Sequence, residues 1–158
     1  MIVSQIMTRN VETCRPGDSL AVAAGRMWDH DIGCLPVLDG EGHVIGMITD
    51  RDACMAAYTQ GLALNSISVE SAMARTVFSC LPTDRVDEVE SVMRLHRIRR
   101  VPIIDPQGHL LGIVSANDVV RESARELRKK NPDVAPGPLV SALAAICEPR
   151  RPTIAAAQ

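Results

Sequence analysis

Hydrophobic residues along this chain follow two kinds of spacing, and the order of the two kinds repeats. Apolar runs bounded by Gly, Pro or Asp predict short buried strands at 35–38 and 44–48, and again at 101–104 and 110–114. The mixed segments at 11–14 and 77–80, each followed by a proline, are predicted to be short first strands. Apolar residues three or four positions apart predict a helix after the first and after the third strand of each set. Each half is therefore expected to fold as strand, helix, strand, strand, helix.

The two halves are copies of one unit. Residues 7–52 align with residues 73–118 without a gap, and 15 of the 46 aligned residues are identical. Unrelated sequences of average composition would share only about three. Because each copy is too small for a good core of its own, the two are expected to pack against one another.

The repeat divides the chain into four parts. We expect a first repeat at 1–61, a linker at 62–72, a second repeat at 73–130, and a C-terminal segment at 131–158. That segment contains a proline-rich loop, a short apolar helix and a tail, and the helix is hydrophobic enough to dock on its own domain or on a second subunit. The predicted fold class is α+β, with two pseudo-symmetric repeats, each a three-stranded sheet packed with helices, plus the C-terminal helix.

Each repeat ends on the same polar pattern, where its third strand meets its last helix. Thr49 and Asp52 stand there in the first copy, and Ser115 and Asp118 in the second. A hydroxyl and a carboxylate at the start of a helix can cap the helix, and they can also hold a polar ligand. Both interpretations remain open at this point.

Composition excludes several classes of function. The net charge of -2 gives no basic field for nucleic acid, and one each of Trp, Tyr and Phe cannot build a platform for stacked bases. The N-terminus lacks the pattern of a signal peptide, and no apolar run is long enough to span a membrane. We therefore expect a cytoplasmic protein without nucleic-acid or membrane partners.

Cysteine and histidine spacing argues against metal and redox chemistry. Five cysteines without a CxxC pair suggest reduced thiols, with a redox sensor at Cys14, Cys34 or Cys54 as a weaker alternative. No histidine spacing fits a metal site. No motif of a nucleophilic enzyme or a Walker loop is present, so we expect neither an enzyme nor a required cofactor.

The residues that close each repeat resemble the CBS domain (cystathionine beta-synthase domain). The pattern Gly-x-x-Thr/Ser-x-x-Asp occupies 46–52 and 112–118, and Met7-Thr8 and the strand at 36–39 match the family as well. Two copies in tandem resemble a CBS pair, also called a Bateman module, of the stand-alone bacterial type. The segment at 144–149 is similar to the tail of a mycobacterial protein of this group.

This resemblance implies a ligand and an assembly. CBS pairs bind adenine nucleotides (AMP, ADP or ATP, sometimes NAD or S-adenosylmethionine) in two clefts between the repeats, and they form homodimers. Asp52 and Asp118 would then accept hydrogen bonds from ribose hydroxyls, and Thr49 and Ser115 would donate to a phosphate. The implied function is a regulatory module whose dimer geometry reports the ligand to an unknown effector protein. The alternative is a protein-interaction module with vestigial clefts that works through its C-terminal helix.

The candidate nucleotide-binding residues combine the helix starts with neighbouring strand positions. They are Ser115, Asp118, Asn117, Arg99, Arg100, Val101, Pro102, Val77 and Ser79 in the second repeat, and Thr49, Asp52, Arg51, Thr13, Cys34, Leu35 and Pro36 in the first. Arginine is a good phosphate partner, but Gly33 and Cys34 replace the second copy's two arginines in the first. The site of the second repeat is therefore predicted to be the stronger.

Overall fold

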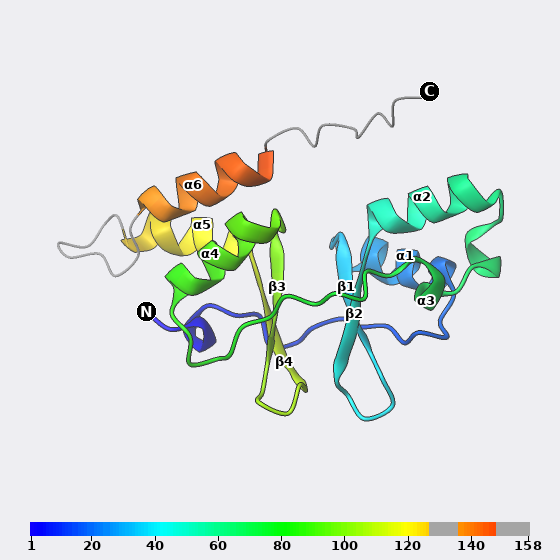
Figure 1. Cartoon of the computed structure of the whole chain (residues 1–158), viewed down its shortest axis with the longest axis horizontal. Helices are drawn as coiled ribbons and strands as arrows, with labels where there is room; N and C mark the ends of the chain where they lie inside the picture. The colour runs from blue at the N-terminus through cyan, green and yellow to red at the C-terminus, as the bar shows by residue number, and fades with distance from the viewer. Residues whose placement is uncertain (127–135, 148–158) are drawn as a thin grey trace, which may run out of the picture.

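The computed structural model describes residues 1–126 and 136–147, and its two repeats lie side by side (Figure 1). Repeat 1 contains α1 (Leu20–Asp29), β1 (Cys34–Leu38), β2 (Val44–Thr49) and α2 (Asp50–Gln60). Repeat 2 contains α4 (Val86–His96), β3 (Arg100–Ile104), β4 (Leu110–Ser115) and α5 (Ala116–Glu126). The remaining elements are η1 (Val3–Gln5), η2 (Leu64–Ser66), α3 (Val69–Ala72) and α6 (Pro136–Cys147). The prediction of an α+β fold with two repeats and a C-terminal helix is confirmed.

The prediction of three-stranded sheets is wrong, because each sheet is a two-stranded antiparallel hairpin, β1–β2 or β3–β4. The expected first strands contribute one parallel bridge each, Cys14 to Val37 and Cys80 to Ile103. Two residues after each bridge stands a proline, Pro16 or Pro82. Since proline has no N–H to donate, the chain turns away and no ladder develops.

Asp18 and Asp84 stand just before α1 and α4, where the sequence pattern predicts helix caps, but this prediction is wrong, because the N-cap residues are Ser19 and Arg85. Each carboxylate instead accepts a hydrogen bond from the backbone N–H three residues before it, at 3.0 Å for Asp18 and 2.7 Å for Asp84. Ser19 caps α1 by accepting from Val22 N at 3.3 Å. The two aspartates therefore close the turns that precede the helices.

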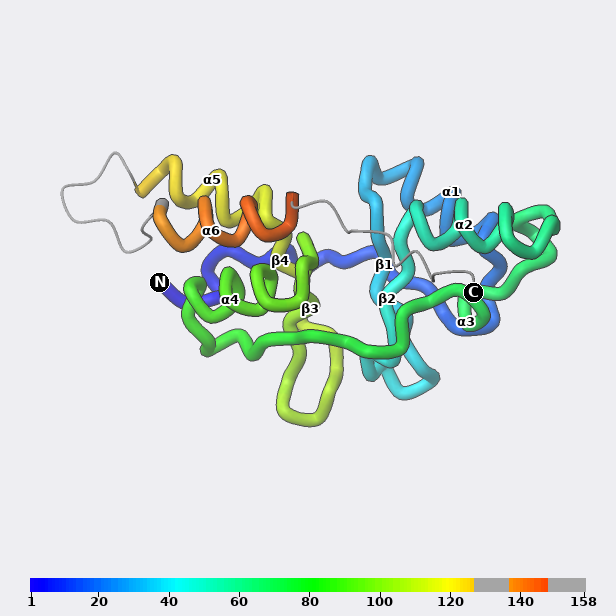
Figure 2. Tube along the Cα trace, turned by 45° about the horizontal axis from the view of Figure 1, so that its top comes forward, coloured from blue at the N-terminus to red at the C-terminus, as the bar shows by residue number. Residues whose placement is uncertain are grey.

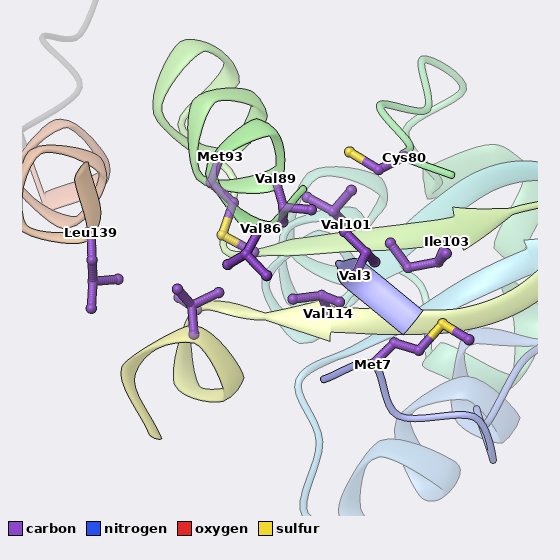
Figure 3. Packing of buried hydrophobic residues seen from close by; sticks show 12 residues of the cluster. Val3, Met7, Cys80, Val86, Val89, Met93, Val101, Ile103, Val114 and Leu139 are labelled. Carbon is purple, nitrogen blue, oxygen red and sulfur yellow. The ribbon is translucent and has the colours of Figure 1, made fainter. Parts of the chain in front are cut away.

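Each repeat completes its hydrophobic core with a segment from outside that repeat. Val3 and Met7, near the N-terminus, are buried among residues of repeat 2 such as Val101 and Val114 (Figure 3). Ile67 and Val69 of the linker and Met73 at the start of repeat 2 are buried in the core of repeat 1. Backbone hydrogen bonds repeat the exchange, since Val3 N donates to Asp84 O and Val69 N donates to Asp18 O, both at 2.8 Å.

Gly46 and Gly112 are the first residues of the two Gly-x-x-Thr/Ser-x-x-Asp patterns. At each of them, the chain that leads into the other repeat crosses the hairpin. Thr8 forms an antiparallel bridge with Ile113 of β4, and Ala74 forms one with Met47 of β2. A Cβ on Gly112 would lie 2.8 Å from both Thr8 O and Met7 Sδ, and a Cβ on Gly46 would meet Ala74 O at 3.0 Å and Met73 Sδ at 2.7 Å. Only glycine admits the crossing chain without displacement.

The two hairpins also touch at their ends. His43 and His109 form an antiparallel bridge, and their imidazole rings stack with centroids 4.5 Å apart. Each imidazole Nδ1 lies 2.9 Å from the aspartate four residues earlier, Asp39 or Asp105. The turn at the end of each hairpin therefore helps to fix the repeats relative to each other.

Helix α6 packs against α4 and α5 of repeat 2 (Figure 2), with Leu139 and Ala142 buried. The sequence pattern predicts this apolar helix from position 139, but it begins at Pro136, since proline is tolerated in the first turn of a helix. The predicted end of the preceding helix near position 130, the loop before Pro136 and the tail from position 148 lie outside the described residues. Among the described residues, no helix combines the length and apolar character that a membrane span requires.

Candidate functional site

The hydroxyl and carboxylate that close each repeat are brought together at a helix start. Oδ2 of Asp118 accepts hydrogen bonds from Ser115 N at 2.8 Å and from Ser115 Oγ at 2.5 Å. In repeat 1, Asp52 Oδ2 accepts from Thr49 N at 3.0 Å and from Thr49 Oγ1 at 2.7 Å. Each pair forms a capping box, so one oxygen of each carboxylate is used within the chain.

The two carboxylates differ at their second oxygen. Arg121, one turn further along α5, donates to Asp118 Oδ1. Asp118 is buried, whereas 74% of the Arg121 side chain is exposed. Met55 occupies the equivalent position of repeat 1, so Asp52 has no such neighbour. The sequence prediction missed Arg121, although its i, i+3 spacing from Asp118 is a known helix pairing.

Strand register brings further predicted residues beside these pairs. Cys34 lies opposite Thr49 in β1–β2, and Arg100 lies opposite Ser115 in β3–β4. Leu35 and Val101 are completely buried within the two cores. These two side chains therefore serve core packing, and they can shape a ligand site only by holding the strands in position.

Pro36 and Pro102 contribute backbone groups instead. Their carbonyl oxygens accept hydrogen bonds from Cys14 N at 3.0 Å and from Cys80 N at 3.2 Å. Both prolines are buried in the strand next to the segments at 11–14 and 77–80. The two prolines thus fix the segments that carry Thr13 and Ser79.

The side chain of Arg100 reaches repeat 1. A hollow of about 720 Å³ lies between α1 and α2, and its lining includes Gly33, Asp50 and Arg100. A Cβ on Gly33 would lie 3.1 Å from Asp50 Oδ2 and 3.7 Å from Arg100 Nη2. The second repeat therefore supplies a cation beside Gly33, where the first repeat lacks the arginine that its partner copy has at the equivalent position. We name this cavity the repeat 1 hollow.

Three cysteine thiols are poorly suited to redox chemistry. Burial raises the pKa of Cys34 to about 11, and the nearby Arg100 guanidinium only partly opposes this. Burial likewise raises the pKa of Cys14 and of Cys80 to about 11. A reactive cysteine needs a stabilised thiolate, so the redox interpretation loses support at Cys14 and Cys34. Cys54 is exposed and free.

The remaining candidates do not gather in one described hollow. Arg51, Arg99 and Asn117 are exposed, and Val77 and Ser79 are half-buried. Thr13 lines a second, polar hollow of about 650 Å³, and its carbonyl accepts from Arg26 Nη1 at 2.5 Å. Neither hollow includes Thr49, Asp52, Ser115 or Asp118.

An aromatic residue between two candidates was missed. Phe78 stacks on His96 at the end of α4, with ring centroids 3.5 Å apart. Its position between Val77 and Ser79 was the available signal. Among the described residues, no group of three or more His, Cys, Asp or Glu side chains is arranged to hold a metal ion.

Comparison with known proteins explains why the two halves agree so closely. A family model of the CBS domain matches residues 3–58 and again residues 69–125. This chain belongs to the CBS-domain family. As a tandem CBS pair it is a regulatory ligand-binding module, and pairs of the stand-alone type are typically non-catalytic. The two matches begin at Val3 and at Val69. These two residues are also structural counterparts, because the backbone N–H of each donates to the aspartate carbonyl that precedes a helix of the neighbouring core, Asp84 or Asp18.

Two curated relatives share this CBS pair over most of their length. The CBS domain-containing protein YhcV of Bacillus subtilis is 34% identical over 117 residues, which are 74% of this chain and 81% of YhcV. Hypoxic response protein 1 of Mycobacterium tuberculosis is 32% identical over 116 residues, which are 73% of this chain and 80% of that protein. The resemblance to stand-alone CBS pairs is thereby confirmed.

A solved CBS structure carries ligands. The CBS domain pair of protein MJ0100, in complex with 5'-methylthioadenosine and S-adenosyl-L-methionine, is 30% identical with a TM-score of 0.69. The match covers 77% of this chain and 94% of the MJ0100 pair. Both of those ligands contain an adenosine group, which is the part that the predicted ribose contacts would recognise.

Proposed function

We propose that this CBS pair senses adenine nucleotides, which bind in clefts between its repeats at the two hydroxyl–carboxylate pairs. The observation that carries the proposal is the duplicated geometry of Ser115–Asp118 and Thr49–Asp52, each at the start of a helix beside a strand of the same hairpin. The adenosine-containing ligands of the MJ0100 pair support it. AMP, ADP and ATP are the candidate ligands, with NAD as a further one, and the role requires no cofactor.

The geometry suggests how a nucleotide would engage the second repeat. Ribose hydroxyls would donate to Asp118 Oδ1 and would displace Arg121 from that oxygen, while Ser115 keeps its bonds to Oδ2. The released guanidinium would gain a new partner in the nucleotide phosphate, because arginine binds phosphate through charge-assisted hydrogen bonds. Ligands that carry a phosphate would therefore compensate for the lost ion pair, and adenosine alone would not.

The order of strength of the two sites is open to test. The two arginines at 99 and 100 predict a stronger site at Asp118. Two structural observations favour Asp52 instead, since Arg121 engages Asp118 and Arg100 reaches the start of α2. The ranking from sequence stays a prediction, and the binding experiment compares both sites.

Calorimetry with AMP, ADP, ATP and NAD would test the proposal, using Asp118→Asn and Asp52→Asn. Asparagine keeps one oxygen for the capping bonds but cannot accept from the ribose with its amide nitrogen. Loss of a hydrogen bond to a charged group corresponds to roughly 10- to 100-fold weaker binding. The exposed Asp29→Asn serves as the control and should bind like the wild type. Wild-type affinity in both site variants, or no binding of any of these nucleotides, would refute the proposal.

Signalling is proposed to proceed through a homodimer that an unknown effector protein reads. A ligand can shift dimer geometry only if it binds the two arrangements with different affinity. Small-angle scattering with and without nucleotide would reveal such a shift. The alternative, an interaction module that works through α6, is favoured by one observation, because 63% of Val140 remains exposed on the docked helix.

A further inference from the structure

Helix α6 covers a surface of repeat 2 that has an open counterpart in repeat 1. In repeat 1, Met27 of α1 and Ala53 of α2 line the repeat 1 hollow. Met27 and Ala53 are themselves buried, as are the residues 66 positions later, Met93 of α4 and Val119 of α5. The two repeats differ in what lies over these helices, because α6 packs on α4 and α5 whereas α1 and α2 border a hollow (Figure 2). We call the surface formed by α4 and α5 under α6 the covered face.

The covered face contains polar atoms that lack partners. Glu90 on α4 is only 3% exposed, and its Oε1 accepts no hydrogen bond from any described residue. Ser123 on α5 is also 3% exposed, and its Oγ is equally unpaired among the described residues. Ala24 and Ala57 occupy the equivalent positions of repeat 1 and line the open hollow there. The polar atoms are thus found on the face that is covered, not on the face that is open.

The apolar surroundings of Glu90 make its ionised form costly. It lies on the buried stripe of α4 with Val86, Val89 and Met93. An unpaired carboxylate away from water is strongly destabilised, so such a group takes up a proton instead. Burial therefore raises the pKa of Glu90 to about 7, and the negative charge of Asp87 adds to this effect.

Within the part of the chain that the structure describes, no charged group pairs with Glu90. On α5, Glu122 pairs with Arg125 at 2.9 Å, and the buried Glu126 is a further acid. Helix α6 carries no charged residue, and its one titratable group is the exposed Cys147 thiol. Strand β3, which also packs against α4, carries Arg100, whose guanidinium lies at the repeat 1 hollow.

We propose that α6 is a releasable cover of the α4–α5 face, docked while Glu90 carries a proton and loosened when Glu90 ionises. Docking removes Glu90 from water and therefore favours the neutral side chain, whereas release lets water solvate the carboxylate. Release would give repeat 2 the kind of open helical face that repeat 1 already has. This device concerns a segment beyond the residues that match the CBS repeats, and it does not depend on nucleotide binding.

The direction of the pH effect follows from proton linkage. The ordinary pKa of a glutamate is 4.5, and burial raises the pKa of Glu90 in the docked form to about 7. Docking is therefore strongest below pH 4.5, weakens as the pH rises toward 7, and is constant above that. The docking equilibrium should fall about 30-fold between about pH 5.5 and about pH 8, because the docked form binds the proton more tightly.

Hydrogen exchange on the full chain, at about pH 5.5 and about pH 8 and corrected for the intrinsic rate, measures α6 docking directly. Amides of α6 in the wild type should lose protection by about 30-fold at the higher pH. In Glu90→Gln, which is isosteric and uncharged, α6 should stay equally protected at both. Glu88→Gln, an exposed neighbour on the same helix, should retain the wild-type loss.

Helix α2 in repeat 1 provides the internal reference and should keep its protection at both pH values. Equal protection of α6 at the two pH values in the wild type would overturn the proposal, and this comparison needs no variant. A loss of protection in Glu90→Gln that matches the wild type would overturn it as well. A parallel loss in α2 would indicate general destabilisation and would refute a local cover.

Discussion

At the scale of single residues, this protein uses the same short-range devices in both repeats. The hydroxyl–carboxylate pair at each helix start and the Asp–His pair at each hairpin end join residues three or four positions apart. Such contacts depend on local backbone geometry, so the sequence could predict that Thr49 meets Asp52 and that Ser115 meets Asp118. The sequence did not indicate that His43 and His109 would stack on one another, since that contact joins two repeats.

The Asp39–His43 pair predicts a titration that can be measured. The hydrogen bond that the His43 ring donates to the Asp39 carboxylate raises the pKa of His43 above 6.5, and the same contact lowers the pKa of Asp39 to about 2. The His43 contribution to stability is therefore complete below pH 6.5 and is lost as the pH rises through the raised value. The Asp39 contribution is complete above pH 3.8 and is lost as the pH falls toward 2.

An NMR titration of the His43 ring in Asp39→Asn tests this, because asparagine keeps the oxygen that accepts from the backbone N–H of His43. The pKa of His43 should fall toward 6.5 in that variant. Glu41→Gln is the control and should lower it less, since Glu41 is 3.7 Å away and is a smaller contributor. An unchanged His43 titration in Asp39→Asn would contradict the assignment.

At the scale of elements, the hairpins form where the apolar runs predict them. The segments that lie along the edges of the two sheets differ from the prediction. Val44–Thr49 and Leu110–Ser115 extend the predicted strands by one residue each. At its outer edge, each of these strands forms a single bridge with the residues that precede the other repeat, Ala74 beside β2 and Thr8 beside β4. No third strand of the same repeat lies there among the described residues. Local periodicity carries no information about which distant segment pairs at an edge, so this exchange required the tertiary structure.

The crossing at Gly112 gives a stability prediction. A Cβ there would collide with the Thr8 carbonyl, which is backbone and cannot move aside as a side chain could. Gly112→Ala should therefore lower the free energy of unfolding by about 1–3 kcal/mol, the usual range for overpacking a buried position. Gly40→Ala is the matched control, because no atom lies within 4 Å of its added Cβ.

Urea denaturation of both variants measures this difference. The unfolding midpoint of Gly40→Ala should stay near that of the wild type, and that of Gly112→Ala should fall. If both variants unfold with the wild-type midpoint, the chain does not cross Gly112 as closely as the structure indicates.

At the scale of the whole molecule, the two repeats are joined by exchanged segments. Val3 lies in the core of repeat 2 and Val69 in the core of repeat 1, so neither core is complete without chain that lies outside its own repeat (Figures 1 and 3). The side chain of Arg100 also joins the two repeats, because it belongs to β3 of repeat 2 and lines the repeat 1 hollow. The clefts proposed for nucleotides lie between units that share their cores, which gives a bound ligand a mechanical connection to both.

The burial of Val3 in the core of repeat 2 predicts which elements a substitution at the N-terminus will destabilise. Val3→Ala removes two buried methyl groups and should lower the free energy of unfolding by about 2 kcal/mol. Hydrogen exchange should locate the lost protection in α4, β3 and β4. Val22→Ala, on an exposed face of α1, should change stability by less than about 0.5 kcal/mol. If Val3→Ala lost amide protection only in α1, β1 and β2, the result would contradict the packing of Val3 in repeat 2.

The sequence by itself determined the duplicated unit, its helices and hairpins, and the polar pairs at 49–52 and 115–118, because these depend on period, turn residues and contacts within four positions. Only the tertiary structure decided the two-stranded sheets, the crossing at Gly46 and Gly112, the reach of Arg100 into repeat 1, and the burial of Glu90 under α6. Each of these joins residues far apart in the chain. Several near-equivalent surfaces could satisfy the same local pattern, and packing in three dimensions selects among them.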